Sequence, residues 1–360
     1  MNENPLVTIC FLTYNYAPLM EKSLQPLINQ SYTNTEVIIS DNQSTDPQVS
    51  IIAQKLARQY PHVRYRYNTP NLKKEDFSDI AEKNSGDKKS YDVVFNHCNT
   101  IIQSGEIKGD FVIFCHQDDL YKPDIIKEQV AFLLAHPQVP CVFTQGNIIN
   151  QSDTIIRPYL FPKELRDKNV YHFAEIFKAI MNHGNFLIAP SFMFRKTMFD
   201  TIGLFDDHGP FGGSDDLEMW LRILESYPIG IIHEPLIHWR TEGRGKKYHK
   251  LRTEKADFFK VMDYYLYEKK YAAGASAKDL RQYEFQKDFD NTLQAMNLLL
   301  KEELLESQKR LGPLSFNIFR AYFENMTLLR TKGMVLKIIL LIGMKLGLEK
   351  LLGKILYRFT

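Results

Sequence analysis

The chain has 360 residues, of which 44% are hydrophobic and 24% charged, and its formal net charge is +2. These values are ordinary for globular proteins and exclude a largely disordered chain. A nucleic-acid-binding protein usually carries a strong basic excess, so the near-zero balance argues against that partner. The length fits one large domain with an appendage, or two domains.

Four cysteines, Cys10, Cys98, Cys115 and Cys141, are spread without any Cys-x-x-Cys pair. They are expected to be buried free thiols in a reducing compartment. The first residues lack a basic stretch followed by an apolar one, so no secretory signal is expected. No uncharged apolar run is long enough for an ordinary transmembrane helix. The predicted location is cytoplasmic, peripheral on the inner face of the cell membrane.

The first half of the chain alternates short β-rich runs with helical patterns. Strands are predicted at residues 6–12, 36–40, 63–67, 111–115 and within 139–149, and helices at 18–30, 49–60, 91–104 and 122–135. This alternation predicts βαβ units and a mostly parallel sheet. The polar segment 68–90 is predicted to be an exposed loop. After about Arg244 the pattern changes to long helices, predicted at 251–270 and 277–308.

Polar clusters follow three of the predicted strands. They are Thr13-Tyr14-Asn15, the run from Asp41 to Asp46, and His116-Gln117-Asp118-Asp119. In open α/β sheets, ligands bind at the carboxyl ends of the strands. Repetition of polar clusters at successive strand ends therefore favours a shared ligand pocket.

Asp118 and Asp119 come directly after the apolar run FVIFC. Two adjacent carboxylates in such a place are costly unless something pairs with them. Mg²⁺ or Mn²⁺ would do so, because both prefer carboxylate oxygens and bridge to substrate phosphates. The alternative is that one of the two aspartates caps the helix that begins near Pro123.

A further acidic pair lies in GGSDDLEMWLR, which spans residues 212–222. Leu217, Trp220 and Leu221 have helical spacing, so a helix is predicted to begin near the carboxylates. Asp215 or Asp216 is then either an N-cap or a general base facing the cleft.

At these residues the chain resembles the family 2 glycosyltransferases, which have the GT-A fold. The resemblance covers about residues 6–240. It is carried, in order, by VTICFLTYN (7–15), LQPLINQSY (24–32), EVIISDNQSTD (36–46), GDFVIFCHQDD (109–119), GLFD (203–206) and DDLEMWLR (215–222). The implied fold is α/β, with a Rossmann-like, mostly parallel central sheet flanked by helices and a C-terminal helical extension. The predicted domains are residues 1–245 (catalytic), 246–332 (helical extension) and 333–360 (a cationic amphipathic helix).

The resemblance also implies roles for individual residues. The implied nucleotide-sugar-binding residues are Thr13, Tyr14, Asp41, Asn42, Asp118 and Arg240, and the implied ligands of Mn²⁺ or Mg²⁺ are Asp119 and Asp118. The implied general base is Asp216, with Asp215 as the second candidate. Arg240 would close over the diphosphate, or else belong to a solvated basic loop.

Two positions depart from the family pattern. Asn42 stands where many members have an aspartate, which leaves UDP, dTDP and GDP all open as the donor nucleotide. His116 stands where many members have another aspartate, and the Gln-Asp-Asp version resembles a rhamnosyltransferase-like branch that uses dTDP-rhamnose.

The segment 333–359 is rich in Leu and Ile, and residues 331–360 contain six basic residues against one acidic residue, Glu349. A cationic helix with a broad apolar face suits the surface of an anionic membrane. The alternative is a helix that packs on the same chain or on a partner protomer.

The predicted function is inverting transfer of a sugar from a nucleotide-diphosphate sugar to a hydroxyl of a glycan or lipid-linked acceptor, in bacterial-type surface polysaccharide synthesis. The alternative is an inactive GT-A domain that serves as a binding or assembly module.

Overall fold

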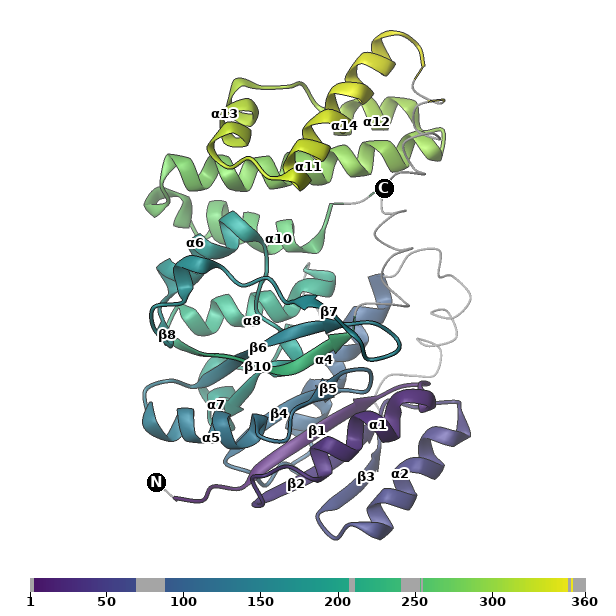
Figure 1. The fold of residues 1–360 in the computed structure, drawn as a ribbon, viewed down its shortest axis with the longest axis vertical. Coiled ribbons are helices and arrows are strands. Elements are labelled where there is room, and N and C mark those ends of the chain that lie inside the picture. Colours follow the sequence, from purple (N-terminus) through teal and green to yellow (C-terminus); the bar gives the residue numbers. More distant parts are fainter. Residues whose placement is uncertain are drawn as a thin grey trace. The chain divides into compact units, whose positions relative to one another are not determined.

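The computed structural model describes residues 3–68, 88–206, 211–240, 253, 255–348 and 351 (Figure 1). Most of the predicted loop at 68–90 lies outside these residues. The chain divides into two compact units, residues 1–177 with 185–243, and residues 178–184 with 244–360.

The first unit is built on one mixed sheet. Its strands are β1 (Val7–Thr13), β2 (Thr35–Asp41), β3 (Val63–Tyr67), β4 (Phe111–His116), β5 (Leu120–Tyr121), β6 (Cys141–Ile149), β7 (Ile155–Pro158), β8 (Val170–Tyr171), β9 (Met193–Arg195) and β10 (Ile229–Arg240). The main order is β3-β2-β1-β4-β9-β6-β10-β5. The long pairings β2–β3, β1–β2, β1–β4 and β6–β10 are parallel, whereas the short β9 runs antiparallel to β4 and β6.

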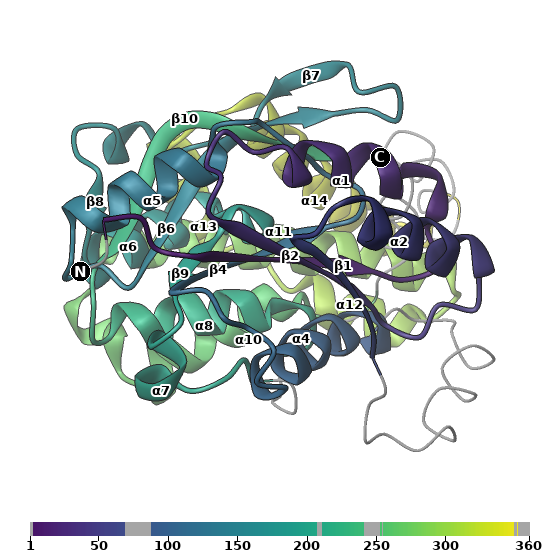
Figure 2. The same ribbon diagram turned by 90° about the horizontal axis from the view of Figure 1, so that it is seen from below.

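Helices cover both faces of this sheet. They are α1 (Ala17–Ile28), α2 (Pro47–Gln59), α4 (Lys88–Gln103), α5 (Ile125–Ala135), α7 (Met198–Ile202) and α8 (Asp215–Leu224). A further helix, α6 (Phe173–His183), begins in the first unit and ends in the second. Figure 2 shows α1, α2 and α5 on one face and α4, α7 and α8 on the other. Every residue of β1 and β2 is buried as a result, which explains why apolar residues follow one another at 9–12 and 37–39 rather than alternating with polar ones.

The predicted elements of the first half are all present, and the α/β class with a C-terminal helical extension is confirmed. β3 has the predicted bounds, and α2 begins two residues earlier than predicted because Asp46 caps it. The Asp46 side chain accepts a hydrogen bond from the Gln48 backbone N–H, and Pro47 fits the first helical position. All four cysteines are buried and free, as predicted.

The second unit consists of helices. They are α10 (Asp257–Asp263), which continues as a π-helical turn over Tyr264–Glu268, α11 (Ala277–Leu300), α12 (Leu304–Leu311), α13 (Phe316–Glu324) and α14 (Leu328–Lys345). The prediction of one helix over 277–308 is wrong. Glu302 adopts a left-handed conformation with φ of 64°, and this breaks the helix between α11 and α12. α12 then folds back on α11, where the Ser307 hydroxyl donates to the Ala295 carbonyl at 2.7 Å.

The helix predicted at 333–359 begins earlier, at Leu328, and its described part ends at Lys345. Residues 349–350 and 352–360 lie outside the described residues. Lys337 is buried: its Nζ donates to the Leu311 carbonyl at 2.9 Å and pairs with the Asp288 carboxylate. On this face α14 therefore packs against its own chain, as the alternative interpretation held. No helix in the described part of the chain combines the length and hydrophobicity needed to span a membrane.

Lys337→Ala is expected to destabilise the second unit by about 3 kcal/mol, because it leaves the largely buried Asp288 carboxylate without its partner. The matched control is Lys345→Ala, which removes an exposed lysine from the same helix and should change stability by less than about 0.5 kcal/mol. Urea denaturation followed by circular dichroism measures both. Equal losses for the two variants would show that the buried ion pair does not stabilise the unit.

Candidate active site

The carboxyl ends of β2, β1 and β4 lie side by side at one edge of the sheet. Thr13 is in register with Asp41, and Leu12 is in register with His116. The three polar clusters predicted from the sequence are therefore neighbours in space.

Gln117 connects the loop after β4 to the loop after β1. Its Oε1 accepts from the Thr13 hydroxyl at 2.6 Å and from the Tyr14 backbone N–H at 2.9 Å, while its Nε2 donates to the Tyr14 carbonyl at 3.1 Å. Thr13 is buried, but the Tyr14 ring is 46% exposed and free to meet a ligand. Gln117 was not among the predicted site residues. Its only signal in the sequence is its place in the polar cluster after the strand.

Asn15 and Asp41 order the loop after β2. Asn15 has a φ of 46°, a conformation that Asn tolerates better than most residues, and its Oδ1 accepts from the backbone N–H groups of Thr45 and Asp46 at 2.7 and 3.0 Å. The Asp41 carboxylate accepts from the Ser44 backbone N–H at 2.8 Å and from the Tyr65 hydroxyl at 2.9 Å. Both Asp41 oxygens are thus engaged within the protein.

A chain of three side chains fixes the orientation of Asn42. Arg66 donates to Asn68 Oδ1 at 3.0 Å, and Asn68 Nδ2 donates to Asn42 Oδ1 at 2.8 Å. Because a guanidinium can only donate, it fixes which end of each amide is the oxygen. Asn42 therefore turns its oxygen toward Asn68 and its Nδ2 donor group away from it.

Asp119 carries the clearest signal for a bound cation. Its side chain is 1% exposed, and Oδ1 accepts from the Arg240 backbone N–H at 3.0 Å. Oδ2 is buried and has no hydrogen-bond partner in the part of the chain that the structure describes, although His116 Nδ1 lies 3.9 Å away. Possible ligand atoms of His116, Asp118 and Asp119 all lie within 4.8 Å of one another. Burial, with a smaller contribution from the Asp118 charge, raises the pKa of Asp119 well above its usual value. A divalent cation at Oδ2 would remove the cost of this unpaired buried oxygen.

The helix-cap alternative for these carboxylates is wrong. α5 begins at Ile125, and its N-cap residue is Asp124, five positions after Asp119. Asp118 and Asp119 instead lie between β4 and β5.

Arg240, the last residue of β10, is buried and bonds to the loop that contains Asp118 and Asp119. Its Nε donates to the Asp118 carbonyl at 2.8 Å, and its other nitrogens bond to the Asn150 carbonyl and the Asp153 carboxylate. The interpretation of Arg240 as part of a solvated loop is therefore wrong. Its predicted contact with the diphosphate stays a prediction.

Arg240→Met should weaken metal-dependent binding of a nucleotide sugar by about tenfold, since groups that orient metal ligands typically contribute 10- to 100-fold to metal affinity. The backbone N–H that binds Asp119 remains in this variant. Titration calorimetry with the donor and Mn²⁺ measures this affinity. The matched control is Arg157→Met, which removes an exposed arginine of β7 and should bind the donor like the wild type. Unchanged affinity in Arg240→Met would contradict the supporting role.

The second acidic pair begins α8. Asp215 is buried, whereas Asp216 is partly exposed and accepts from the Leu217 backbone N–H at 2.7 Å. Neither residue is the N-cap, which is Ser214, so that alternative is wrong. Burial raises the pKa of Asp216 to about 6. A carboxylate of this pKa is suited to accept a proton near neutral pH.

Tyr159 and Trp239 lie near the end of β10. The pKa of Tyr159 is raised to about 12, first by burial and then by the charge of Asp216. The Tyr159 ring meets Trp239 edge to face, with centroids 5.5 Å apart, and Trp239 directly precedes Arg240. Neither aromatic residue stands out in the sequence pattern.

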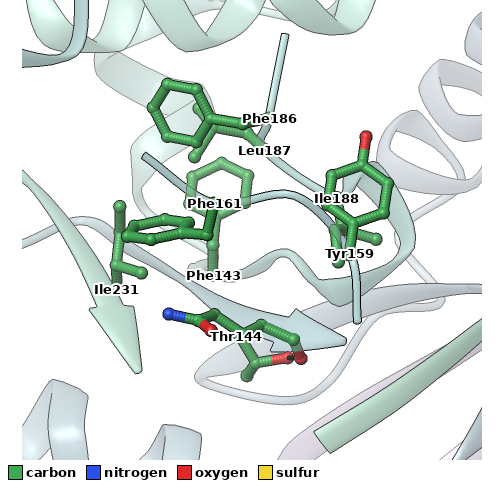
Figure 3. Close-up of a pocket in the computed structure, with 9 residues that line it drawn as sticks. Phe143, Thr144, Tyr159, Phe161, Phe186, Leu187, Ile188 and Ile231 are labelled. Carbon is green, nitrogen blue, oxygen red and sulfur yellow. Dashed lines mark hydrogen bonds between the residues drawn. The ribbon is translucent and has the colours of Figure 1, made fainter. Parts of the chain in front are cut away.

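A small apolar cavity adjoins Tyr159 (Figure 3). Phe161, Phe186 and Ile231 are among the side chains that line it, and its volume of about 10 Å³ has room for roughly one water molecule. This cavity is too small and too apolar to hold a nucleotide or a sugar.

Comparison with known proteins finds similarity to glycosyltransferases. The model of the family described as "Glycosyl transferase family 2" matches residues 8–76, which include β1, α1, β2, α2 and β3. An uncharacterized glycosyltransferase of Rickettsia typhi is 26% identical over 246 residues, covering 66% of this chain and 64% of its own. The putative glycosyltransferase EpsE of Bacillus subtilis is 24% identical over 225 residues, covering 62% of this chain and 69% of its own. By these matches the chain is similar to family 2 glycosyltransferases.

The match between this chain and its relatives is partial. Besides the two proteins above, an uncharacterized protein y4gI of Sinorhizobium fredii is 24% identical over 244 residues, which cover only 23% of its length. Among solved structures, the mannosyltransferase PcManGT of Pyrobaculum calidifontis, in complex with GDP-Man and Mn²⁺, has a TM-score of 0.48 at 17% identity, over 99% of this chain and 87% of that one.

Proposed function

We propose that this protein is a family 2 glycosyltransferase that moves a sugar from a nucleotide-diphosphate sugar to a hydroxyl of a glycan or lipid-linked acceptor, with inversion at the anomeric carbon, in bacterial-type surface polysaccharide synthesis. The observation that carries the proposal is the buried, unpaired Oδ2 of Asp119 at the carboxyl edge of the parallel strands. The glycosyltransferase names of its relatives support the reaction class.

The donor is expected to bind across the ends of β1, β2 and β4. The exposed Tyr14 ring and the Asn42 amide lie at this edge and would meet the nucleotide base of UDP, dTDP or GDP. Asp119 and Asp118 would hold Mn²⁺ or Mg²⁺, with His116 beside them. The cation would neutralise the negative charge that develops on the departing diphosphate.

Asp216 is proposed as the general base. Its carboxylate takes the proton of the acceptor hydroxyl while that oxygen bonds to the anomeric carbon and the bond from this carbon to the diphosphate oxygen breaks. One displacement from the opposite side inverts the anomeric centre. Asp215, the second candidate, is more deeply buried and less able to reach an acceptor. The presence of both acidic pairs argues against an inactive binding module.

Sugar transfer tests the proposal directly. The protein is incubated with UDP-, dTDP- and GDP-sugars, Mn²⁺, and a mixture of oligosaccharide and lipid-linked acceptors, and release of the nucleoside diphosphate is measured together with the glycosylated product. One nucleotide class should give both products. Absence of donor turnover with every combination, in a protein that is folded, would count against glycosyl transfer.

A further inference from the structure

The second unit exposes a row of large apolar side chains on α13. Phe316, Phe319 and Phe323 recur at helical spacing, and Phe316 and Phe323 are 79% and 66% exposed. Three more exposed apolar residues follow within six positions: Met326, Leu328 and Leu329. Scattered apolar residues on a surface need no explanation, but six exposed ones within residues 316–329, three of them lining one hollow on α13, mark an interaction surface.

These phenylalanines do not belong to the packed face of the helix. The opposite face of α13 contributes Ile318 and Ala321 to a buried cluster with Phe285 of α11 and Met334 of α14. α13 is therefore already anchored, and its aromatic row remains outside the core. Figure 1 shows α13 and α14 on the same side of α11.

The apolar surface continues along α14. Leu328, Val335, Ile342 and Leu346 are exposed at intervals of seven, seven and four residues, so they lie along one side of the helical pattern. Lys332 falls in the same stripe and is exposed. The inward residues of α14 are a different set, which includes the paired Lys337.

The charge along α13 and α14 is mainly positive. Residues 309–348 contain seven basic residues and a single acidic one, Glu324, which is already bonded to Arg281 and Arg320. Of the basic residues, Lys309 and Arg310 pair with Glu306, and Lys337 pairs with Asp288. Lys332 and Lys345 are exposed. A partner of negative charge is therefore favoured.

We propose that this face docks on the surface of an anionic phospholipid bilayer. The α13–α14 face is defined by the exposed apolar residues Phe316, Phe319, Phe323, Met326, Leu328 and Leu329, with Lys332 and Lys345 as cationic neighbours. Phenylalanine and leucine enter the boundary between headgroups and acyl chains, and nearby lysines are attracted to anionic headgroups. The main apolar part of this face is α13, which precedes the cationic helix predicted at 333–360. The proposal does not depend on glycosyl transfer.

Sedimentation with vesicles tests the proposal on the full chain, without any nucleotide sugar. The wild type should sediment with vesicles of phosphatidylcholine and phosphatidylglycerol at 7:3, bind pure phosphatidylcholine weakly, and be released as salt rises. Phe316→Ser/Phe323→Ser should lower the partition coefficient at least tenfold. The matched control is Ile51→Ser/Leu305→Ser, which removes two equally exposed apolar residues from α2 and α12 and should leave binding unchanged. Circular dichroism and thermal melting confirm that both variants are folded.

Two outcomes would overturn the proposal. One is a wild type that stays in the supernatant, or a Phe316→Ser/Phe323→Ser variant that sediments like the wild type. The other is a self-associated protein, seen by light scattering, that becomes monomeric with the same substitutions and does not bind vesicles, which would assign the face to a second copy of the chain. Donor binding measured on the same samples is independent of both results, so failure here leaves the proposed enzymatic function untouched.

Discussion

Asp216→Asn is expected to lower the rate of sugar transfer about 1,000-fold, because the amide cannot take the proton of the acceptor hydroxyl. Affinity for the nucleotide sugar should stay within about twofold, since Asp216 is expected to face the acceptor rather than the nucleotide. The two quantities are measured separately, by initial rates of product formation and by titration calorimetry with the donor. Near-normal transfer in this variant would move the base to Asp215 or elsewhere.

The pH dependence of the wild type gives a second measurement of the same group. The pKa of Asp216 is raised to about 6, so the side chain is the active carboxylate above that pH and an inactive acid below it. The value of kcat/KM for sugar transfer should therefore fall about tenfold per pH unit below pH 6 and level off above pH 7. A rate that stays flat down to pH 4.5 would contradict the assignment of the base.

Asp119→Ala is expected to abolish the effect of Mn²⁺ on donor binding and to weaken that binding at least 100-fold. The substitution removes the buried carboxylate whose Oδ2 has no hydrogen-bond partner among the described residues. Calorimetric titration of the donor with Mn²⁺ and with EDTA measures the effect. The matched control, Asp110→Ala, removes an exposed carboxylate just before the opposite end of β4 and should bind the donor like the wild type.

Stability of the same variant provides an independent readout. Burial raises the pKa of Asp119, so at neutral pH the ionised group opposes folding when no cation is bound. The metal-free protein should accordingly lose no more than about 1 kcal/mol in Asp119→Ala, although the Arg240 backbone N–H loses its acceptor. Stabilisation of the variant by Mn²⁺ equal to that of the wild type would exclude Asp119 as a metal ligand.

The parallel core and the location of the site could be predicted from the sequence because both depend on local patterns. The apolar runs that form β1 and β4 are typical of strands buried on both faces, and the polar residues after them mark the strand ends. Parallel pairing then brings Thr13, Asp41 and His116 to one edge without further information.

Other features depend on contacts between residues distant in the sequence and leave no local signal. Asn42 is oriented through Asn68 by Arg66, and Lys337 is buried because Asp288, 49 positions away, receives it. The break before α12 was missed because Glu302 adopts a left-handed conformation where no glycine or proline marks a helix end.

A thermal-shift panel of UDP-, dTDP- and GDP-sugars, each with and without Mn²⁺, tests the proposed metal-dependent nucleotide-sugar site most directly. A donor at 100 times its dissociation constant should add about 2.7 kcal/mol of stability. We expect one nucleotide class to raise the melting temperature only when Mn²⁺ is present, and to lose this effect in Asp119→Ala. Melting temperatures that are unchanged by every donor with Mn²⁺ would contradict the proposed site.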